Sequence, residues 1–404
     1  MERQNNITSE ALYRRNMAVF RIAKIAQSLI FLSPIWVAYE RQFLSFSQLT
    51  AIEASIMAIQ ILFDLPTGVI ADMFGRRIAI MAGLFLWGTA EIVYSGSSTF
   101  QGFLVYAILF GIGNSFSSGA WESLLYDTVK EAGKEHMFPI EHARQSMIFQ
   151  FGYALACLVG GVIGNISYLY AIWATATTWY IGSVVAFFFI EPHIDSVRYT
   201  VSDYTNRLKI GMKELVKNKH VASISLFYIL VGALTWTCQY SFTAMLLTQL
   251  GYTPTEFGYS IAILRIVCGV TLFQFAKYLH VFNRSSVFLF FAFVLLIGFL
   301  PGVLFTKWTA LPFIGILMFS SAARWSILGK YVNAEYSSET RATALSALST
   351  SINIIYIIIM FASGPIIERY GGVKTVFTLL GIIAAVTVFP VGIRLAFTHK
   401  GRGA

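Results

Sequence analysis

The sequence predicts an all-α integral membrane protein with twelve transmembrane helices in two pseudo-symmetric six-helix halves. Composition is the first observation: of 404 residues, 56% are hydrophobic and 12% are charged, whereas soluble domains carry about 25% charged residues. The second is a regular series of apolar segments, each about 20 residues long and able to cross a bilayer. The third is the position of lysine and arginine, which gather on one side of the predicted membrane.

Twelve apolar segments follow one another along the chain. The first half holds spans at residues 17–39, 47–70, 77–95, 102–125, 143–164 and 168–190. The second half holds spans at residues 221–247, 255–276, 286–306, 309–330, 342–364 and 373–395. We therefore predict an N-terminal half over 1–190, a cytoplasmic linker over 191–220 and a C-terminal half over 221–404.

The linker contains one basic segment with helical spacing of its apolar residues, DYTNRLKIGMKELVKNK at 203–219. Leu208, Met212, Leu215 and Val216 recur at the spacing of one helix face. Two interpretations stay open: an amphipathic helix lying on the membrane surface, or a solvated linker helix.

The charges of the loops give the orientation. With the N-terminus inside, 21 of the 29 lysines and arginines fall in cytoplasmic segments and 4 in outside loops. This bias places both termini in the cytoplasm and the protein in the cytoplasmic (inner) membrane. The net charge of +9 follows from this topology, so no nucleic-acid partner is expected. The first residues are too polar for a signal peptide.

A short internal repeat supports two parallel halves. The segment FSSGAWESLL at 116–125 aligns with FSSAARWSIL at 319–328, at an offset of 203 residues. This offset equates the fourth span with the tenth, as parallel repeats of six helices require.

A polar interruption between the second and third spans is the strongest local motif. Residues 64–77 read DLPTGVIADMFGRR. Gly68 and Asp72 are four apart and share a helix face, and Gly75 permits a backbone conformation that other residues resist. Arg76 and Arg77 then anchor the turn on the cytoplasmic side.

This motif, Gly68-x-x-Ala71-Asp72-x-x-Gly75-Arg76-Arg77, resembles the loop 2–3 signature of the major facilitator superfamily. The resemblance implies a twelve-helix transporter with alternating access and a central site between the halves. It also implies a conformational latch that does not touch substrate, in which Asp72 lies near the start of the eleventh helix (339–348) and Arg76 reaches the fourth-helix acid Asp127. The latch residues expected on this basis are Asp64, Gly68, Asp72, Gly75, Arg76, Arg77 and Asp127.

Enzymatic motifs are absent from the sequence. It has no HExxH, no GxSxG and no phosphate-cradling Gly-Lys loop, so a non-enzymatic protein without nucleotide, metal or other cofactor is expected. Cys157, Cys238 and Cys268 lie in apolar spans without a CxxC partner, which indicates neither disulfides nor a metal site. Uphill transport would then depend on an ion or solute gradient.

Charged residues inside the spans are the main candidates for a transport pathway, because each costs about 3 kcal/mol at the bilayer centre. Arg265 lies about 16 Å along the eighth span from Pro254, near the membrane centre. Arg324 and Glu122 lie at similar depths in the repeated segment, so they are expected to pair across the halves or to bind substrate. The alternatives are a static ion pair within one half and a side chain that reaches the interface.

Three further charged sites receive separate interpretations. Glu53, in the outer third of the second span, is a proposed proton site. Glu91, near the outer end of the third span, is expected at the lipid interface or in packing. Arg21 and Lys24 lie one turn apart near the inner end of the first span, where snorkelling to the interface is the default expectation.

Polar and aromatic residues of the inner helices are expected to line a cavity of mixed character that suits an amphipathic or aromatic molecule. They are Gln27, Asn114, Trp121, Trp236, Gln239, Tyr240, Trp325, Asn353 and Tyr356. In the fifth span, Gly152, Ala156, Gly160 and Gly164 recur every four residues, which permits close helix approach. Drug/proton antiporters of the superfamily end this helix with Gly-Pro-x-x-Gly-Gly, and the sequence LVGGVIGNIS lacks the proline.

The sequence as a whole predicts a monomeric, proton-coupled secondary transporter for a small organic solute. Two arginines deep in the second half favour an anionic or carboxylate-bearing solute. The first alternative is a multidrug/proton antiporter for amphipathic compounds, against which Arg265 argues. The second is a transporter-like lipid flippase, for which Glu91 is the only hint, or a sensor.

Overall fold

The computed structural model describes residues 9–192, 201–277 and 283–397. Those residues form helices joined by short connections, and none of them lies in a β-strand. The chain divides into two compact units. Unit 1 comprises Met1–Trp36 and Ser55–Ser202, and unit 2 comprises Val37–Ala54 and Asp203–Ala404.

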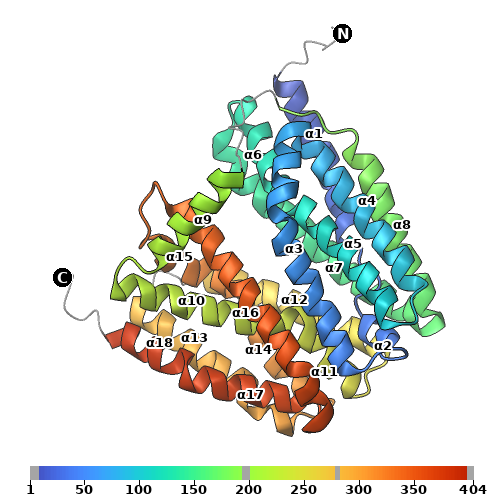
Figure 1. The fold of residues 1–404 in the computed structure, drawn as a ribbon, viewed down its shortest axis with the longest axis vertical. Helices are drawn as coiled ribbons and strands as arrows, with labels where there is room; N and C mark the ends of the chain where they lie inside the picture. Colours follow the sequence, from blue (N-terminus) through green and yellow to red (C-terminus); the bar gives the residue numbers. More distant parts are fainter. Residues whose placement is uncertain (1–8, 193–200, 278–282, 398–404) are drawn as a thin grey trace. The chain divides into compact units, whose positions relative to one another are not determined.

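Unit 1 is built from helices that follow one another along the first half of the chain. They are α1 (Ser9–Ser28), the later part of α3 (Phe46–Phe74), α4 (Arg76–Ser95), α5 (Phe100–Ser117), α6 (Ala120–Glu131), the short η1 (Glu135–Met137), α7 (Phe138–Ile166) and α8 (Tyr168–Ala186). Helix α8 packs against both α1 and α4 (Figure 1). Phe20, Leu84, Trp87, Leu124 and Trp179 meet in the buried core of this unit.

Unit 2 begins with the short α2 (Trp36–Glu40) and the first residues of α3. Its other elements are α9 (Val201–Leu215), α10 (Lys219–Thr237), η2 (Cys238–Phe242), α11 (Thr243–Gln249), α12 (Pro254–Lys277), α13 (Arg284–Phe299), η3 (Leu300–Leu304), α14 (Ala310–Ala323), η4 (Arg324–Leu328), α15 (Gly329–Asn333), α16 (Arg341–Arg369), α17 (Val373–Val386) and α18 (Val388–Phe397). The elements η2 and η4 are π-helical turns that continue α10 and α14, respectively.

Ten helical stretches in the described part of the chain are long and apolar enough to cross a membrane. Helices α1 and α8 are also long, at 20 and 19 residues, but they are not among these ten. Four cations lower the hydropathy of α1, and tyrosine, threonine and serine lower that of α8. The expected count of twelve spans therefore stays a prediction.

The first expected span, 17–39, is not one continuous helix. Helix α1 ends at Ser28, turns follow, and α2 begins at Trp36. Pro34 lies between them, and a proline disfavours helical backbone at the residue before it. Hydropathy alone did not reveal this break, because the apolar run continues through the turns.

Close helix contacts depend on glycine at a few positions. A Cβ on Gly113 of α5 would lie 2.7 Å from Cδ1 of Trp87 in α4. In the fifth predicted span, which is α7, a Cβ on Gly160 would collide with the carbonyl oxygen of Phe31. These glycines let backbone pack directly against a neighbouring segment, as the spacing in the fifth span suggested.

The linker helix α9 lies against α16 of unit 2. A Cβ on Gly211 would be 2.5 Å from the carbonyl oxygen of Thr343. Ile210, Met212 and Val216 nevertheless stay exposed, which keeps the membrane-surface interpretation of this helix open. Residues 193–200 of the expected linker lie outside the described residues.

Candidate functional site

The loop motif forms a tight turn between α3 and α4. Gly75 has φ of +100°, which is the conformational role expected for it. The guanidinium of Arg76 pairs with the Asp72 carboxylate at 3.1 Å, one helical turn apart. The turn therefore carries an ion pair of its own.

An acid that the sequence analysis did not single out holds this turn. The backbone N–H groups of Arg76 and Arg77 donate to the two carboxylate oxygens of Glu191, at 2.6 and 2.9 Å. N–H groups in the first turn of a helix have no acceptor within the helix. Glu191 supplies that acceptor here, because the residue before α4, Gly75, provides no side-chain cap. A Cβ on Gly75 would lie 2.8 Å from the Glu191 carboxyl carbon, so glycine is also needed for space.

The other expected latch residues occupy different places. Asp127 of α6 interacts electrostatically with Arg76, although the ion pair of Arg76 is with Asp72. Asp64 lies two helical turns before Asp72, about 12 Å away along α3, and contacts Ser115 of α5. The structure thus separates Asp64 from the turn. Gly68 has open space around its Cα.

A buried carboxylate with hydroxyl partners lies in unit 2. The hydroxyls of Ser241 and Tyr356 donate to Glu53 Oε2 at 3.0 and 3.3 Å, and the two hydroxyls are 2.7 Å apart. The ring of Tyr240 is 6.1 Å from that of Tyr356 and stacks on Trp236 at 5.5 Å. Four of the residues expected along the pathway therefore gather at one place, and Ser241 completes the cluster.

The start of α3 contacts the C-terminal part of α16 within unit 2. The Ser47 N–H donates to the Glu368 carboxylate at 2.8 Å. A Cβ on Gly364 would lie 2.6 Å from the Cα of Ser47. These contacts fix the helix that carries Glu53.

Arg324 is a deeply buried cation of unit 2, with 1% of its surface exposed. Its guanidinium lies 4.8 Å from the ring of Tyr228 and 4.5 Å from that of Trp325. Within the described residues, Nε and Nη1 have no hydrogen-bond partner and no carboxylate forms an ion pair with this arginine. The sequence placed Arg324 correctly inside a span but did not indicate this degree of enclosure.

The Glu53 cluster and the surroundings of Arg324 each include a π-helical turn. Tyr240 and Ser241 lie in η2, and Arg324 and Trp325 lie in η4. Such turns insert an extra residue into a helix and occur often at functional sites. Residues expected along the transport pathway thus lie in π-helical turns at two places, one after α10 and one after α14.

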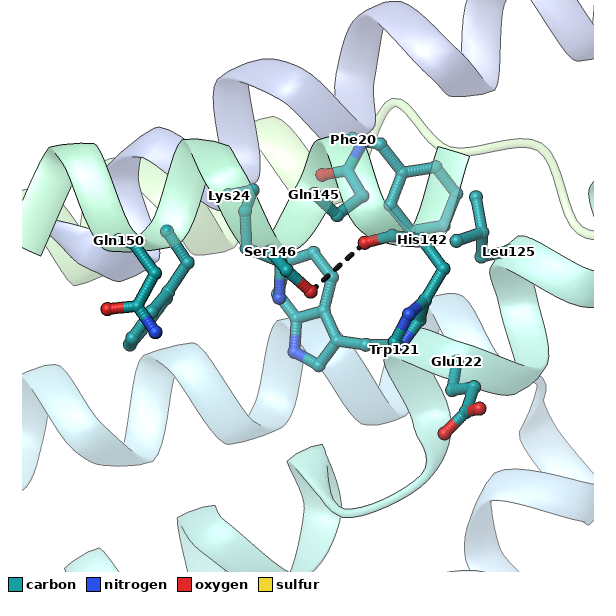
Figure 2. A pocket seen from close by; sticks show the side chains of 10 residues that line it. Phe20, Lys24, Trp121, Glu122, Leu125, His142, Gln145, Ser146 and Gln150 are labelled. Atoms are coloured by element: carbon teal, nitrogen blue, oxygen red, sulfur yellow. Dashed lines mark hydrogen bonds between the residues drawn. The ribbon is translucent and has the colours of Figure 1, made fainter. Parts of the chain in front are cut away.

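A cavity of about 210 Å³ lies in unit 1, between α1, α6 and α7 (Figure 2). Trp121 and Glu122, both expected in the pathway, line it. Lys24, His142 and Gln145 line it as well, and the sequence analysis did not assign them to a site. Lys24 donates to Gln27 at 2.7 Å and lies 4.3 Å from the Trp121 ring centre, so its side chain packs along the cavity wall.

The remaining expected residues lie on α5, α12, η2 and α16. Asn114 accepts a hydrogen bond from Trp87 at 2.8 Å, which gives it a packing role within unit 1. Arg265 is half-buried on α12 and acts electrostatically on Cys268. Gln239 and Asn353 are half-buried on η2 and α16.

Of the two places expected for Glu91, the structure supports packing and excludes an exposed position, because none of its surface is exposed. Among the described residues, neither carboxyl oxygen has a hydrogen-bond partner. Helices α5 and α8, which pack against its helix, contain no charged residue. Position near a span end did not reveal that this side chain points into unit 1.

Solved structures show which fold this is. The nucleoside transporter NupG matches with a TM-score of 0.75 at 14% identity, over 96% of this chain and 100% of that one. A bacterial homolog of the human lysosomal transporter Spinster matches with a TM-score of 0.68 at 14% identity, over 99% and 100% of the chains. The peptide transporter POT gives 0.68 at 14% identity, over 96% and 95%.

Sequence comparison gives the family. An uncharacterized MFS-type transporter of Methanocaldococcus jannaschii is 20% identical over 305 residues, or 72% of this chain and 74% of that protein. An uncharacterized transporter of Buchnera aphidicola subsp. Schizaphis graminum is 21% identical over 175 residues, or 43% of this chain and 44% of that protein. The model of the Major Facilitator Superfamily matches residues 22–320. The chain therefore belongs to the Major Facilitator Superfamily of secondary membrane transporters.

Proposed function

We propose that this chain moves a small carboxylate-bearing solute across the cytoplasmic membrane by alternating access, coupled to protons. In this proposal α1 and α8 complete twelve spans, arranged as six-helix halves over 1–190 and 221–404 around the linker 191–220. Both termini face the cytoplasm, and the monomer is the working unit. The proposal follows the family and the chemistry of particular side chains.

Arg324 is the observation that carries the choice of solute. A buried charge is costly unless it is paired, yet the described residues offer this guanidinium aromatic faces and no carboxylate. Aromatic faces stabilise a cation by about 0.5–2 kcal/mol, which is less than the several kcal/mol lost on removing an ion from water. A carboxylate that binds both free N–H groups would supply the missing partner.

Access to Arg324 would come with the transport cycle. The side chain is closed off as the structure stands, and alternating access consists of opening and closing such sites. The π-helical turn at η4 is a suitable place for this change, because an extra residue in the helix can shift along it. Binding of the anion would then be linked to the conformational step.

The Glu53 cluster supports proton coupling. A carboxylate inside a span is expensive when charged, and here two hydroxyl groups donate to one of its oxygens. Loss of the proton would leave a carboxylate that those hydroxyls stabilise, and uptake of a proton would give a neutral acid. We assign proton binding to Glu53, with Ser241 and Tyr356 as the groups that hold it in place.

The turn at 64–77 would act as the latch, away from substrate. Glu191, Asp72 and Arg76 supply its hydrogen bonds and its ion pair. Substitution there should change turnover more than substrate affinity. This separation distinguishes the latch residues from Arg324.

Transport by purified protein in liposomes tests the proposal. A thermal-shift screen of metabolites and drugs at two pH values first identifies stabilising ligands, because a ligand that binds the folded state raises its stability. Uptake of a stabilising carboxylate is then measured with and without a proton gradient. Arg324→Gln should abolish uptake, Arg324→Lys should restore part of it, and the exposed Arg369→Gln on α16 should leave it unchanged.

The alternative functions predict other results. Stabilisation by lipophilic cations alone, with Arg324→Gln harmless, would favour a multidrug/proton antiporter and overturn the carboxylate proposal. A flippase would move labelled lipid instead of a soluble solute. The burial of Glu91 removes the feature that had pointed to a flippase.

A further inference from the structure

In the cavity between α1, α6 and α7, some polar groups of the lining have no hydrogen-bond partner among the described residues. It is walled by three helices, and Figure 2 shows the side chains of Lys24, His142 and Gln145 around the indole of Trp121. Its volume of about 210 Å³ equals the share of about seven waters in the liquid. A solute of the size of a small amino acid or hydroxy acid fits this space.

Gln145 is the most informative of these residues. It is 95% buried, since only 5% of its surface is exposed. In the described part of the chain, both its amide nitrogen and its carbonyl oxygen lack a hydrogen-bond partner, and so does Nε1 of Trp121. A buried polar group without a hydrogen-bond partner is destabilising. The cavity lining therefore has two donor nitrogens and one acceptor oxygen that a ligand can satisfy.

Lys24 supplies the charge. Its ammonium has three N–H donors, and the structure shows one donated to Gln27 while the ring of Trp121 lies 4.3 Å from the nitrogen. Among the described residues it contacts Gln27 and the rings of Trp121 and Phe149 and forms no ion pair. The nearest acid of the lining is Glu122, which is exposed. Lys24 thus favours an anion in the cavity.

We propose that this cavity binds the head group of an α-amino or α-hydroxy carboxylate. The carboxylate accepts from Lys24, from Trp121 Nε1–H and from the amide nitrogen of Gln145. The adjacent amino or hydroxyl group donates to Oε1 of Gln145, which is the acceptor that a simple carboxylate leaves unsatisfied. Phe20 and Phe149 of the lining contact the hydrocarbon part. This assignment rests on the proposed transport of carboxylates and names the solute class. It is a carboxylate site of unit 1 in addition to the one proposed at Arg324 of unit 2.

The test uses three probes of nearly equal size with the purified full-length protein. Propionate lacks a donor next to its carboxylate, whereas lactate carries a hydroxyl and alanine an ammonium. Dissociation constants come from thermal shifts at graded concentrations. Lactate or alanine should bind at least about fivefold more tightly than propionate, because propionate leaves the buried acceptor of Gln145 without a partner.

Two variants assign the effect to the cavity. Gln145→Leu should abolish the preference for lactate or alanine over propionate, and it should fold because it removes an unpartnered polar group without changing volume much. Lys24→Gln should weaken all three probes. The control is Gln101→Leu, the same exchange on an exposed residue of α5 in unit 1, which should change neither.

The outcomes separate this inference from the proposed function. If the wild type binds all three carboxylates equally and Arg324→Gln abolishes binding, the cavity assignment fails while carboxylate transport stands. If Gln145→Leu keeps the preference, the cavity assignment fails as well. If no carboxylate binds the wild type, both are overturned.

Discussion

Glu191 should be essential to the stability of the loop between α3 and α4. Glu191→Ala removes the acceptor of two N–H groups in the first turn of α4, which are bonded at 2.6 and 2.9 Å. Loss of a helix cap costs about 1–2 kcal/mol, and loss of the negative charge at a helix N-terminus costs about 0.3–1 kcal/mol. Glu191 is half-buried, so water can accept hydrogen bonds from the freed N–H groups and offset part of this loss. We therefore expect the free energy of unfolding to fall by about 2 kcal/mol in total.

Equilibrium unfolding in mixed micelles measures this loss. Glu191→Gln keeps one acceptor oxygen and should lose about half as much stability, since the charge and one bond are gone. Glu135→Ala, an exposed glutamate of the same unit, is the control and should stay within about 0.5 kcal/mol of the wild type. Transport by Glu191→Ala should show lower turnover with nearly unchanged substrate affinity.

A second substitution makes the test specific to the observed contact. Gly75→Ala combines a positive φ with a Cβ 2.8 Å from the Glu191 carboxyl carbon. The steric part of its cost should vanish in the Glu191→Ala background, whereas the cost of the backbone conformation, about 1–3 kcal/mol, should remain. If the two substitutions are additive and Glu191→Ala alone is harmless, the proposed cap is refuted.

Three other predictions follow from buried groups. Glu91→Gln should leave stability unchanged or raise it, because it replaces a buried acid without described partners; an unfolding free energy lowered by more than about 1 kcal/mol would contradict this. Gly160→Leu should lower the free energy of unfolding by about 1–3 kcal/mol or more through overpacking. Gly269→Ala should be tolerated in the same assay, because a Cβ at Gly269 would have open space around it. Glu53→Gln should flatten the pH profile of transport in liposomes, and Tyr356→Phe should shift its midpoint; unchanged profiles in both would exclude Glu53 as the proton site.

Some features could be derived from local sequence alone. The membrane class follows from hydropathy, because insertion depends on the summed transfer free energy of consecutive residues. The conformation of Gly75 follows from the motif around it, since backbone sterics are a property of single residues. The placement of Arg324 and Glu53 inside spans follows from the same local count.

Other features were decided by tertiary structure. Glu191 reaches Arg76 across 115 positions of sequence, and Ser241 reaches Glu53 across 188; no local pattern encodes either contact. The sequence indicated an interface position for Lys24 and did not indicate that it packs against Trp121 in a lining shared with Gln145. For Glu91 the sequence left the lipid interface and packing open, and the packing of α4 decided between them. Hydropathy depends on which residues are consecutive, whereas burial and hydrogen-bond partners depend on which helix faces meet, and that is settled only when the helices pack.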